Sequence, residues 1–323
     1  GNMEEEDPTE EYVDQKFKKI QIKNFGENEI KEYIKNYFNY RKNDENLKKN
    51  FTQKNFYEVV NTLKEKMPIF NSPYLLNMVC NVIPTNEVFR NKSNLEYLKR
   101  NTIYRLFFNI IYQNELNRRK NNHLLPKIKF NGVLEILQIK EMLNFSMNMA
   151  AILYIQMYNF NVLKFNSMTK LAEGENSQNL IKIKSYIHKE ENSPFLKYLK
   201  NEPKEKFFFE VTPLNKIDSE KWIFQHKSIM EYFVALKIKK EIKEYSIDNF
   251  YQNLYSLVIC NTKLTDNPGT LEFLMELIRE NNEIIIEKLL KIVMDSKVLT
   301  DHVNILSSNC MTLLNYLDYN FGH

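Results

Sequence analysis

Glycine is scarce in this chain, which has six glycines among 323 residues, at positions 1, 26, 132, 174, 269 and 322. A phosphate-binding loop requires the pattern GxxxxGK followed by Ser or Thr, because several backbone N–H groups must converge on phosphate oxygens without a side-chain clash. None of the six glycines stands in that context, and the same scarcity excludes a GxGxxG dinucleotide-binding loop. We therefore expect neither kind of nucleotide loop in this sequence.

Histidine and cysteine are too few and too scattered to form a local metal site. The five histidines include no HExxH pair, and the three cysteines include no CxxC pair. A GxSxG nucleophile motif is absent as well, so we expect no catalytic residues and no metal ligands. The cysteines, Cys80, Cys260 and Cys310, each lie in an apolar run. This context predicts buried thiols in a reducing compartment rather than disulfides.

Long apolar runs and a strong excess of one charge are also absent. Lys and Arg number 45 against 41 Asp and Glu, and a formal charge of +4 produces no strong field toward nucleic acid or an anionic membrane. The longest apolar stretch, over 145–160, is interrupted by polar residues and is shorter than the roughly 20 residues of a membrane span. The chain begins with acidic and polar residues, unlike a secretory signal. We predict a cytoplasmic protein with no membrane segment.

Apolar residues make up 43% of the chain, with 22 Phe and 19 Tyr, which is sufficient for packed cores. Their spacing over 29–38 predicts an amphipathic helix, followed by a polar loop over 41–50. Ile20 and Ile22 alternate with polar residues before it and indicate a short strand. The helical spacing continues over 56–67, 73–83, 93–119 and 145–160. Pro73 suits the first turn of its helix, and Ser93 to Glu96 have the form of a capping box.

The pattern changes from helical to alternating after position 206. Apolar residues alternate over 207–211 and again over 222–225, which predicts a β-hairpin whose loop spans 212–220. From His226 the spacing becomes helical again. The last part of the chain predicts helices only, over 250–260, 270–278, 283–293 and 309–317.

The segment WIFQHKSIMEYFVALKI, from Trp222 to Ile238, carries the most specific motif of the chain. It resembles the winged-helix signature of NACHT-family NTPases of the STAND class, in which a strand delivers an aromatic-x-His-Lys-Ser turn and a helix continues Glu-Tyr-Phe-x-Ala. Upstream, 20–38 is similar to the family's segment after the nucleotide-sensing strand, and 71–84 resembles its lid helix. Downstream, 266–278 and 307–317 resemble the helical stretch that leads to the family's C-terminal repeats.

The resemblance implies a mainly α fold with four parts along the chain. These are a flexible acidic leader over 1–19, a helical lid domain over 20–87, a winged-helix domain with one β-hairpin over 88–240, and an α-helical arm over 241–323. The family's phosphate loop and its Mg²⁺-binding acidic strand, which would precede Ile20, have no counterpart in this sequence. The same holds for the repeats that would follow the arm.

Two nucleotide-binding residues are implied by the resemblance. His226 would contact the β-phosphate of bound ADP, and Pro73 would lie against the adenine ring. A histidine at a strand end can donate an N–H to an anionic oxygen. The residues themselves leave a second interpretation open at each position, because His226 could instead brace the turn before its helix, and Pro73 could be an ordinary first-turn proline.

The implied function is that of the regulatory half of a NACHT-type signalling switch. ADP would hold this half against a P-loop domain of the same protein or of a partner chain, with Mg²⁺ expected only in that P-loop half. Exchange for ATP would release the contact with His226 and lead to homo-oligomerisation or to partner binding. Any ATPase activity would belong to the full-length protein, since this sequence has no P-loop.

Two other functions stay open. One is a non-catalytic helical scaffold of NACHT ancestry that has lost the use of nucleotide. The other is a winged helix that binds nucleic acid through a row of lysines on and before its last helix. These lysines are Lys227, Lys237, Lys239, Lys240 and Lys243. Glutamates interleave with them, which favours a solvated amphipathic face, and we expect no nucleic-acid partner.

Overall fold

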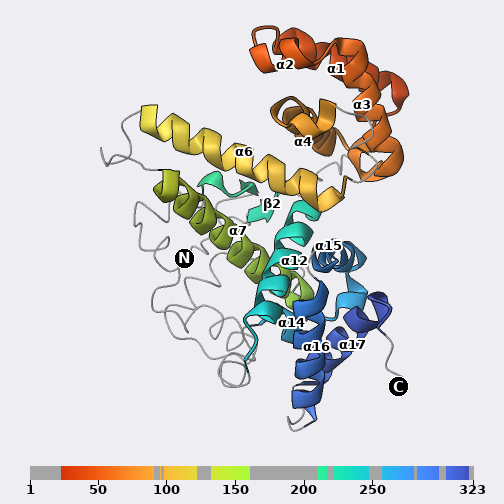
Figure 1. The fold of residues 1–323 in the computed structure, drawn as a ribbon, viewed down its shortest axis with the longest axis vertical. Helices are drawn as coiled ribbons and strands as arrows, with labels where there is room; N and C mark the ends of the chain where they lie inside the picture. Colours follow the sequence, from red (N-terminus) through yellow and green to blue (C-terminus); the bar gives the residue numbers. More distant parts are fainter. Residues whose placement is uncertain are drawn as a thin grey trace, which may run out of the picture.

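The computed structural model describes residues 23–90, 95, 98–121, 132–160, 210–216, 222–246, 257–279, 282–297 and 303–319. Within these ranges the protein is mainly helical and has one two-stranded antiparallel sheet (Figure 1). The predicted mainly α class is therefore confirmed. The strand predicted at Ile20 and Ile22 lies outside the described residues, as do Ser93 and Glu96 of the predicted capping box.

The first part of the chain folds into short helices. They are α1 (Glu27–Tyr40), α2 (Glu45–Asn50), α3 (Gln53–Lys66) and α4 (Pro73–Val82), with the 3-10 turns η1 (Pro68–Asn71), η2 (Ile83–Thr85) and η3 (Glu87–Arg90). The loop predicted over 41–50 is wrong in its second half, which forms α2. The Asp44 carboxylate accepts a hydrogen bond from the Leu47 N–H, and Leu47 is buried, so a cap and one core contact together stabilise this short helix.

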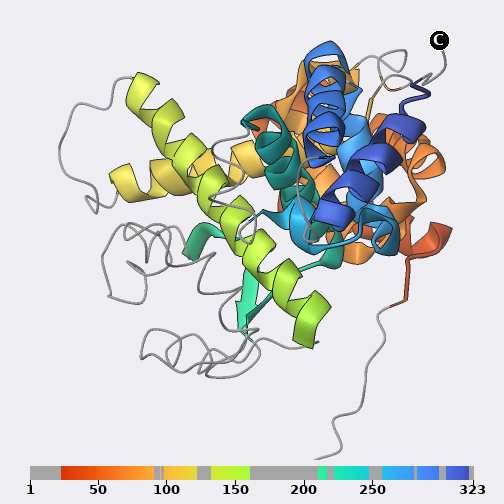
Figure 2. The same ribbon diagram turned by 90° about the horizontal axis from the view of Figure 1, so that it is seen from below.

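Three long helices cross at the centre of the molecule. They are α6 (Arg100–Asn121), α7 (Gly132–Phe160) and α12 (Lys227–Lys243). α12 packs against both of the others, and Figure 2 shows α7 running diagonally across α6. α12 is buried on almost all sides, which is why its apolar residues do not form a single stripe. None of the described helices is long and apolar enough to cross a membrane.

The predicted hairpin exists, but its first strand lies later in the chain than expected. β1 (Leu214–Lys216) pairs with β2 (Trp222–Phe224), and Leu214 lies opposite Phe224. Residues 207–209 of the expected first strand lie outside the described residues, and Glu210 and Val211 are helical. Phe224 is buried and Leu214 packs against the same core, so burial of this cross-strand pair sets the register.

The last part of the chain consists of α14 (Val258–Asn261), the 3-10 turn η5 (Leu264–Asp266), α15 (Pro268–Ile278), α16 (Asn282–Ser296) and α17 (Asn304–Tyr316). α15 packs along α12, and α16 packs against α17. Helix α15 begins at Pro268 rather than after Gly269, because a proline at the first helical position lacks only an N–H that would have no partner inside the helix. Most of the helix predicted over 250–260 lies outside the described residues.

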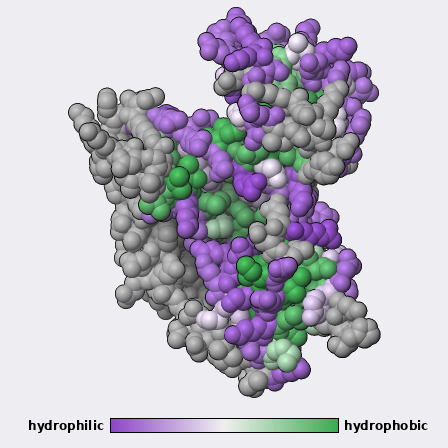
Figure 3. Space-filling view, in the orientation of Figure 1, coloured by the Kyte–Doolittle hydropathy of each residue, from purple (hydrophilic) through white to green (hydrophobic). Residues whose placement is uncertain are grey.

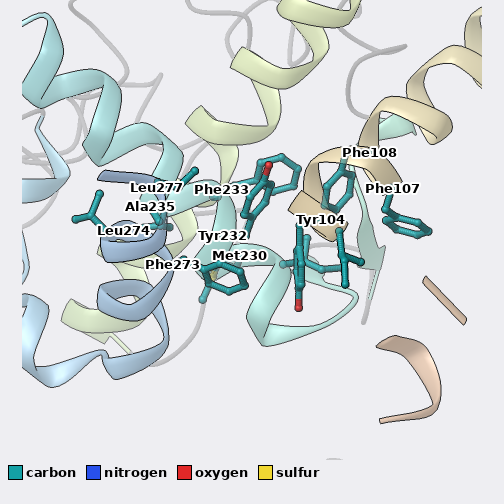
Figure 4. Close-up of a cluster of buried hydrophobic side chains, with 14 of the residues drawn as sticks. Tyr104, Phe107, Phe108, Met230, Tyr232, Phe233, Ala235, Phe273, Leu274 and Leu277 are labelled. Carbon is teal, nitrogen blue, oxygen red and sulfur yellow. The ribbon is translucent and has the colours of Figure 1, made fainter. Parts of the chain in front are cut away.

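An aromatic cluster joins the central helices to the C-terminal ones (Figure 4). Ring centroids lie 4.9 Å apart for Tyr104 and Phe273, 4.6 Å for Phe108 and Phe233, and 5.6 Å for Tyr232 and Phe273. These rings come from α6, α12 and α15, so the Tyr-Phe pair of the Glu-Tyr-Phe triplet packs in the core. Figure 3 shows hydrophilic residues over most of the N-terminal helices and apolar residues along the central crossing.

Candidate functional site

His226 lies between strand β2 and helix α12 and caps the helix. Its backbone is extended, and its Nδ1 accepts a hydrogen bond from the backbone N–H of Ser228 at 3.2 Å. Histidine is an uncommon N-cap, yet the imidazole nitrogen here satisfies one of the N–H groups that the first turn leaves without a helical partner. The bracing interpretation of His226 is therefore what the structure shows.

The cap determines which nitrogen of the imidazole carries the proton. Because Nδ1 accepts from an N–H group, it is unprotonated, and the proton of the neutral ring lies on Nε2. Burial lowers the pKa of His226, so the neutral form dominates at neutral pH. Nε2 has no hydrogen-bond partner among the residues that the structure describes. The site therefore presents one N–H donor that the cap does not use.

Two buried hydroxyl groups extend the hydrogen bonding of the His226 side chain. The Ser228 hydroxyl lies 2.7 Å from His226 Nδ1 and 2.6 Å from the hydroxyl of Tyr104, and both Ser228 and Tyr104 are buried. With Nδ1 as acceptor, the Ser228 hydroxyl donates to it together with the Ser228 N–H, and the Tyr104 hydroxyl donates to the Ser228 hydroxyl. Neither residue was predicted as a site residue from the sequence. Ser228 lies inside the quoted motif, whereas nothing near Tyr104 in the sequence marks it.

The start of helix α4 lies directly against the imidazole. The rings of Tyr74 and His226 are nearly parallel, at 5°, with centroids 6.0 Å apart. The Tyr74 hydroxyl donates to Gln225 Oε1 at 2.8 Å, and burial raises the pKa of Tyr74 to about 12, so this hydroxyl stays protonated. Tyr74 follows Pro73, and the structure thus brings the segments of both predicted site residues together.

Pro73 is the first residue of α4, as its position in the sequence predicted. It is half-buried, and the first helical hydrogen bond runs from the Leu76 N–H to the Ser72 carbonyl at 2.8 Å. The ordinary role of a first-turn proline therefore accounts for the backbone at this position. A contact between Pro73 and a base remains a prediction.

Three of the five lysines considered for nucleic acid make contacts with neighbouring helices. Lys237 Nζ donates to Asn148 at 3.0 Å, Lys239 Nζ donates to the carbonyl of Leu277 at 2.6 Å, and Lys240 Nζ lies 3.4 Å from Asn144 Oδ1. Such contacts orient these three side chains across α7 and α15 rather than toward one outer surface. The geometry gives no support to a nucleic-acid interface on α12.

Other chemistry is not assembled in the described part of the chain. No group of three or more His, Cys, Asp or Glu residues in the described ranges could hold a metal ion. Cys80, Cys260 and Cys310 are buried and unpaired with one another, and burial raises the pKa of each thiol well above its ordinary value. They are small core residues at neutral pH, since only a thiolate is a good nucleophile.

No protein-family model, no curated protein and no solved structure matches this chain. The resemblance to NACHT-family NTPases therefore rests on the residues of the motifs alone.

Proposed function

We propose that this chain is the regulatory half of a NACHT-type nucleotide-dependent switch, in which the turn at His226 helps to hold ADP against a P-loop domain. The observation that supports this most is the imidazole itself: its Nε2–H is a donor without a partner among the described residues, and it sits at the start of a 17-residue helix. A helix N-terminus and a neutral N–H donor both favour a phosphate oxygen.

The surroundings of His226 suit a nucleotide in a second way. Tyr74 places an aromatic ring beside the imidazole, and Pro73 is the residue before it at the start of α4. Flat, apolar surfaces of this kind favour the base of a nucleotide, while the N–H donor favours its phosphates. The two predicted roles, phosphate contact for His226 and adenine contact for Pro73, are therefore compatible with one bound ADP.

The packing of α12 suggests how the switch would transmit a signal. α12 begins at the His226 turn and packs along α7, α15 and α16. A nucleotide that binds the start of α12 in one state and not in the other would bias the position of this whole group of helices. We expect ADP to favour the resting arrangement and ATP to release it, with oligomerisation or partner binding as the output. Mg²⁺ would be held by the P-loop half.

The test separates the cap from the nucleotide contact. Serine is a good N-cap and has no N–H at the position of Nε2, so His226→Ser keeps the cap and removes the nucleotide contact. His226→Ala removes both the cap and the contact. In the full-length gene product, we expect both variants to retain less ADP than the wild type after purification, measured by chromatography of the nucleotide released on denaturation. Only His226→Ala should melt at a lower temperature.

A helical scaffold without nucleotide is the second candidate, and one observation favours it. The contacts of Nδ1 with Ser228 already explain His226 as a structural cap. If the His226→Ser protein holds as much ADP as the wild type, or if the wild type holds none, the switch is refuted and the scaffold is supported. The gene sequence that encodes any segment before this chain adds a direct check, because the switch requires a P-loop in the same protein or in a partner.

A further inference from the structure

A cavity of about 530 Å³ lies where α3, α6 and α15 meet, and its lining includes no residue of the turn at His226. Figure 1 shows these three elements one below the other at the junction of the N-terminal helices with the rest of the molecule. The volume falls in the range of small-molecule sites. Its lining residues are Lys66, Met67, Leu98, Lys99, Arg100, Glu272, Glu276 and Arg279.

Positive charge dominates the lining, which holds four cations and two carboxylates. Arg100 forms ion pairs with both carboxylates, since its guanidinium lies 3.2 Å from Glu272 and 3.3 Å from Glu276. Glu276 also accepts a hydrogen bond from the Asn101 N–H at 2.9 Å. Both glutamates thus have partners, and the remaining cations leave the cavity with a net positive charge.

Two of the cations have no carboxylate partner within the described ranges. Lys99 is exposed, and Arg279 makes only a long hydrogen bond of 3.4 Å to the carbonyl of Tyr316. Arg100 lies over the ring of Phe273 at 3.8 Å and is already paired with the two glutamates. Lys99 and Arg279 are therefore the cations of the lining with which an anionic oxygen in the cavity would pair.

Helix ends account for part of this arrangement. Lys66 ends α3 and Arg279 follows α15, and cations are favourable at helix C-termini. That preference explains the residue type at each helix end. It does not explain why Lys99 lines the same cavity, nor why the cavity has an apolar wall formed by Met67 and Leu98.

We propose that this cavity binds a small organic anion, whose acidic group contacts Lys99 and Arg279 and whose apolar part lies against Met67 and Leu98. Binding there joins three elements that are distant in sequence, so the ligand stabilises their mutual packing. The site shares no residue with the His226 turn and does not depend on the switch proposed above.

The test uses anilinonaphthalene sulfonate, a fluorescent probe with an aromatic body and one anionic group, titrated into the chain at low ionic strength. The double variant Lys99→Glu/Arg279→Glu changes only exposed side chains, and its fold is checked by circular dichroism. Reversal of two charges near the probe should weaken binding by about tenfold or more. The control Lys35→Glu/Lys42→Glu makes the same change in net charge on and beside α1 and should bind as the wild type does.

Inorganic pyrophosphate, compared with sodium chloride at equal ionic strength, should displace the probe from the wild type, and the probe should bind the His226→Ser protein normally. The proposal is overturned if both charge-reversal variants lose the same affinity, because the effect is then one of net charge. It is also overturned if neither variant loses affinity.

Discussion

The hydrogen bonds that run from the Tyr104 hydroxyl through the Ser228 hydroxyl to His226 Nδ1 predict how three variants change the free energy of unfolding. Ser228→Ala leaves the Tyr104 hydroxyl, which is 0% exposed, without its 2.6 Å partner. An orphaned buried hydroxyl costs about 1–3 kcal/mol in the free energy of unfolding. Tyr104→Phe removes the hydroxyl itself, while Ser228 keeps its contact with His226 Nδ1, so this change costs only about 1 kcal/mol.

The double variant distinguishes the loss of a hydrogen-bond partner from a simple loss of packing. With both polar groups gone, no buried hydroxyl is left without a partner, so Tyr104→Phe/Ser228→Ala should be more stable than the sum of the single effects by about 1–2 kcal/mol. Urea unfolding followed by the fluorescence of Trp222, the single tryptophan, reports on the strand next to this site. Additivity to within about 0.5 kcal/mol would refute the hydrogen-bonded chain.

Two further predictions concern the contacts of α12 with the C-terminal helices. Glu241 accepts the N–H groups of Val258 and Ile259 at 3.2 and 3.3 Å, and burial raises its pKa from 4.5 to about 7. The folded state thus holds the proton more tightly than the unfolded state, so the wild type should lose stability as the pH rises from 4.5 through 7. Glu241→Gln should show a flatter dependence of stability on pH when urea unfolding is measured at a series of pH values. Equal pH profiles for the two proteins would contradict the buried, protonated carboxyl. At Gly269, an added Cβ would lie 2.5 Å from the carboxyl of Glu231, so Gly269→Ala should lower the melting temperature. In a Glu231→Ala background the same change should no longer lower the melting temperature, because the carboxyl that the added Cβ would meet is gone. A loss of stability in both backgrounds would show that Glu231 is not the obstacle.

The helices that the sequence predicted well are those whose signals are local. The apolar spacing of α1 and the proline at the start of α4 lie within a few residues of the structure they specify. The turn at His226 belongs to the same class, because a strand, a cap and a helix follow one another in a short segment. For the candidate site, both predicted residues could therefore be placed on their elements from sequence alone.

Whatever depends on partners far along the chain was decided only by the tertiary structure. The hairpin register follows from the packing of Leu214 opposite Phe224 against the core. The alternation of apolar residues over 207–211 did not predict this register. The contacts of Tyr74 with His226 and of Tyr104 with Ser228 join segments more than a hundred residues apart. No local pattern encodes such pairs, because they arise where the buried faces of separate helices meet. The sequence by itself determined a mainly helical chain with a histidine at the start of a helix, and the packing of α4, α6 and α12 decided what surrounds that histidine.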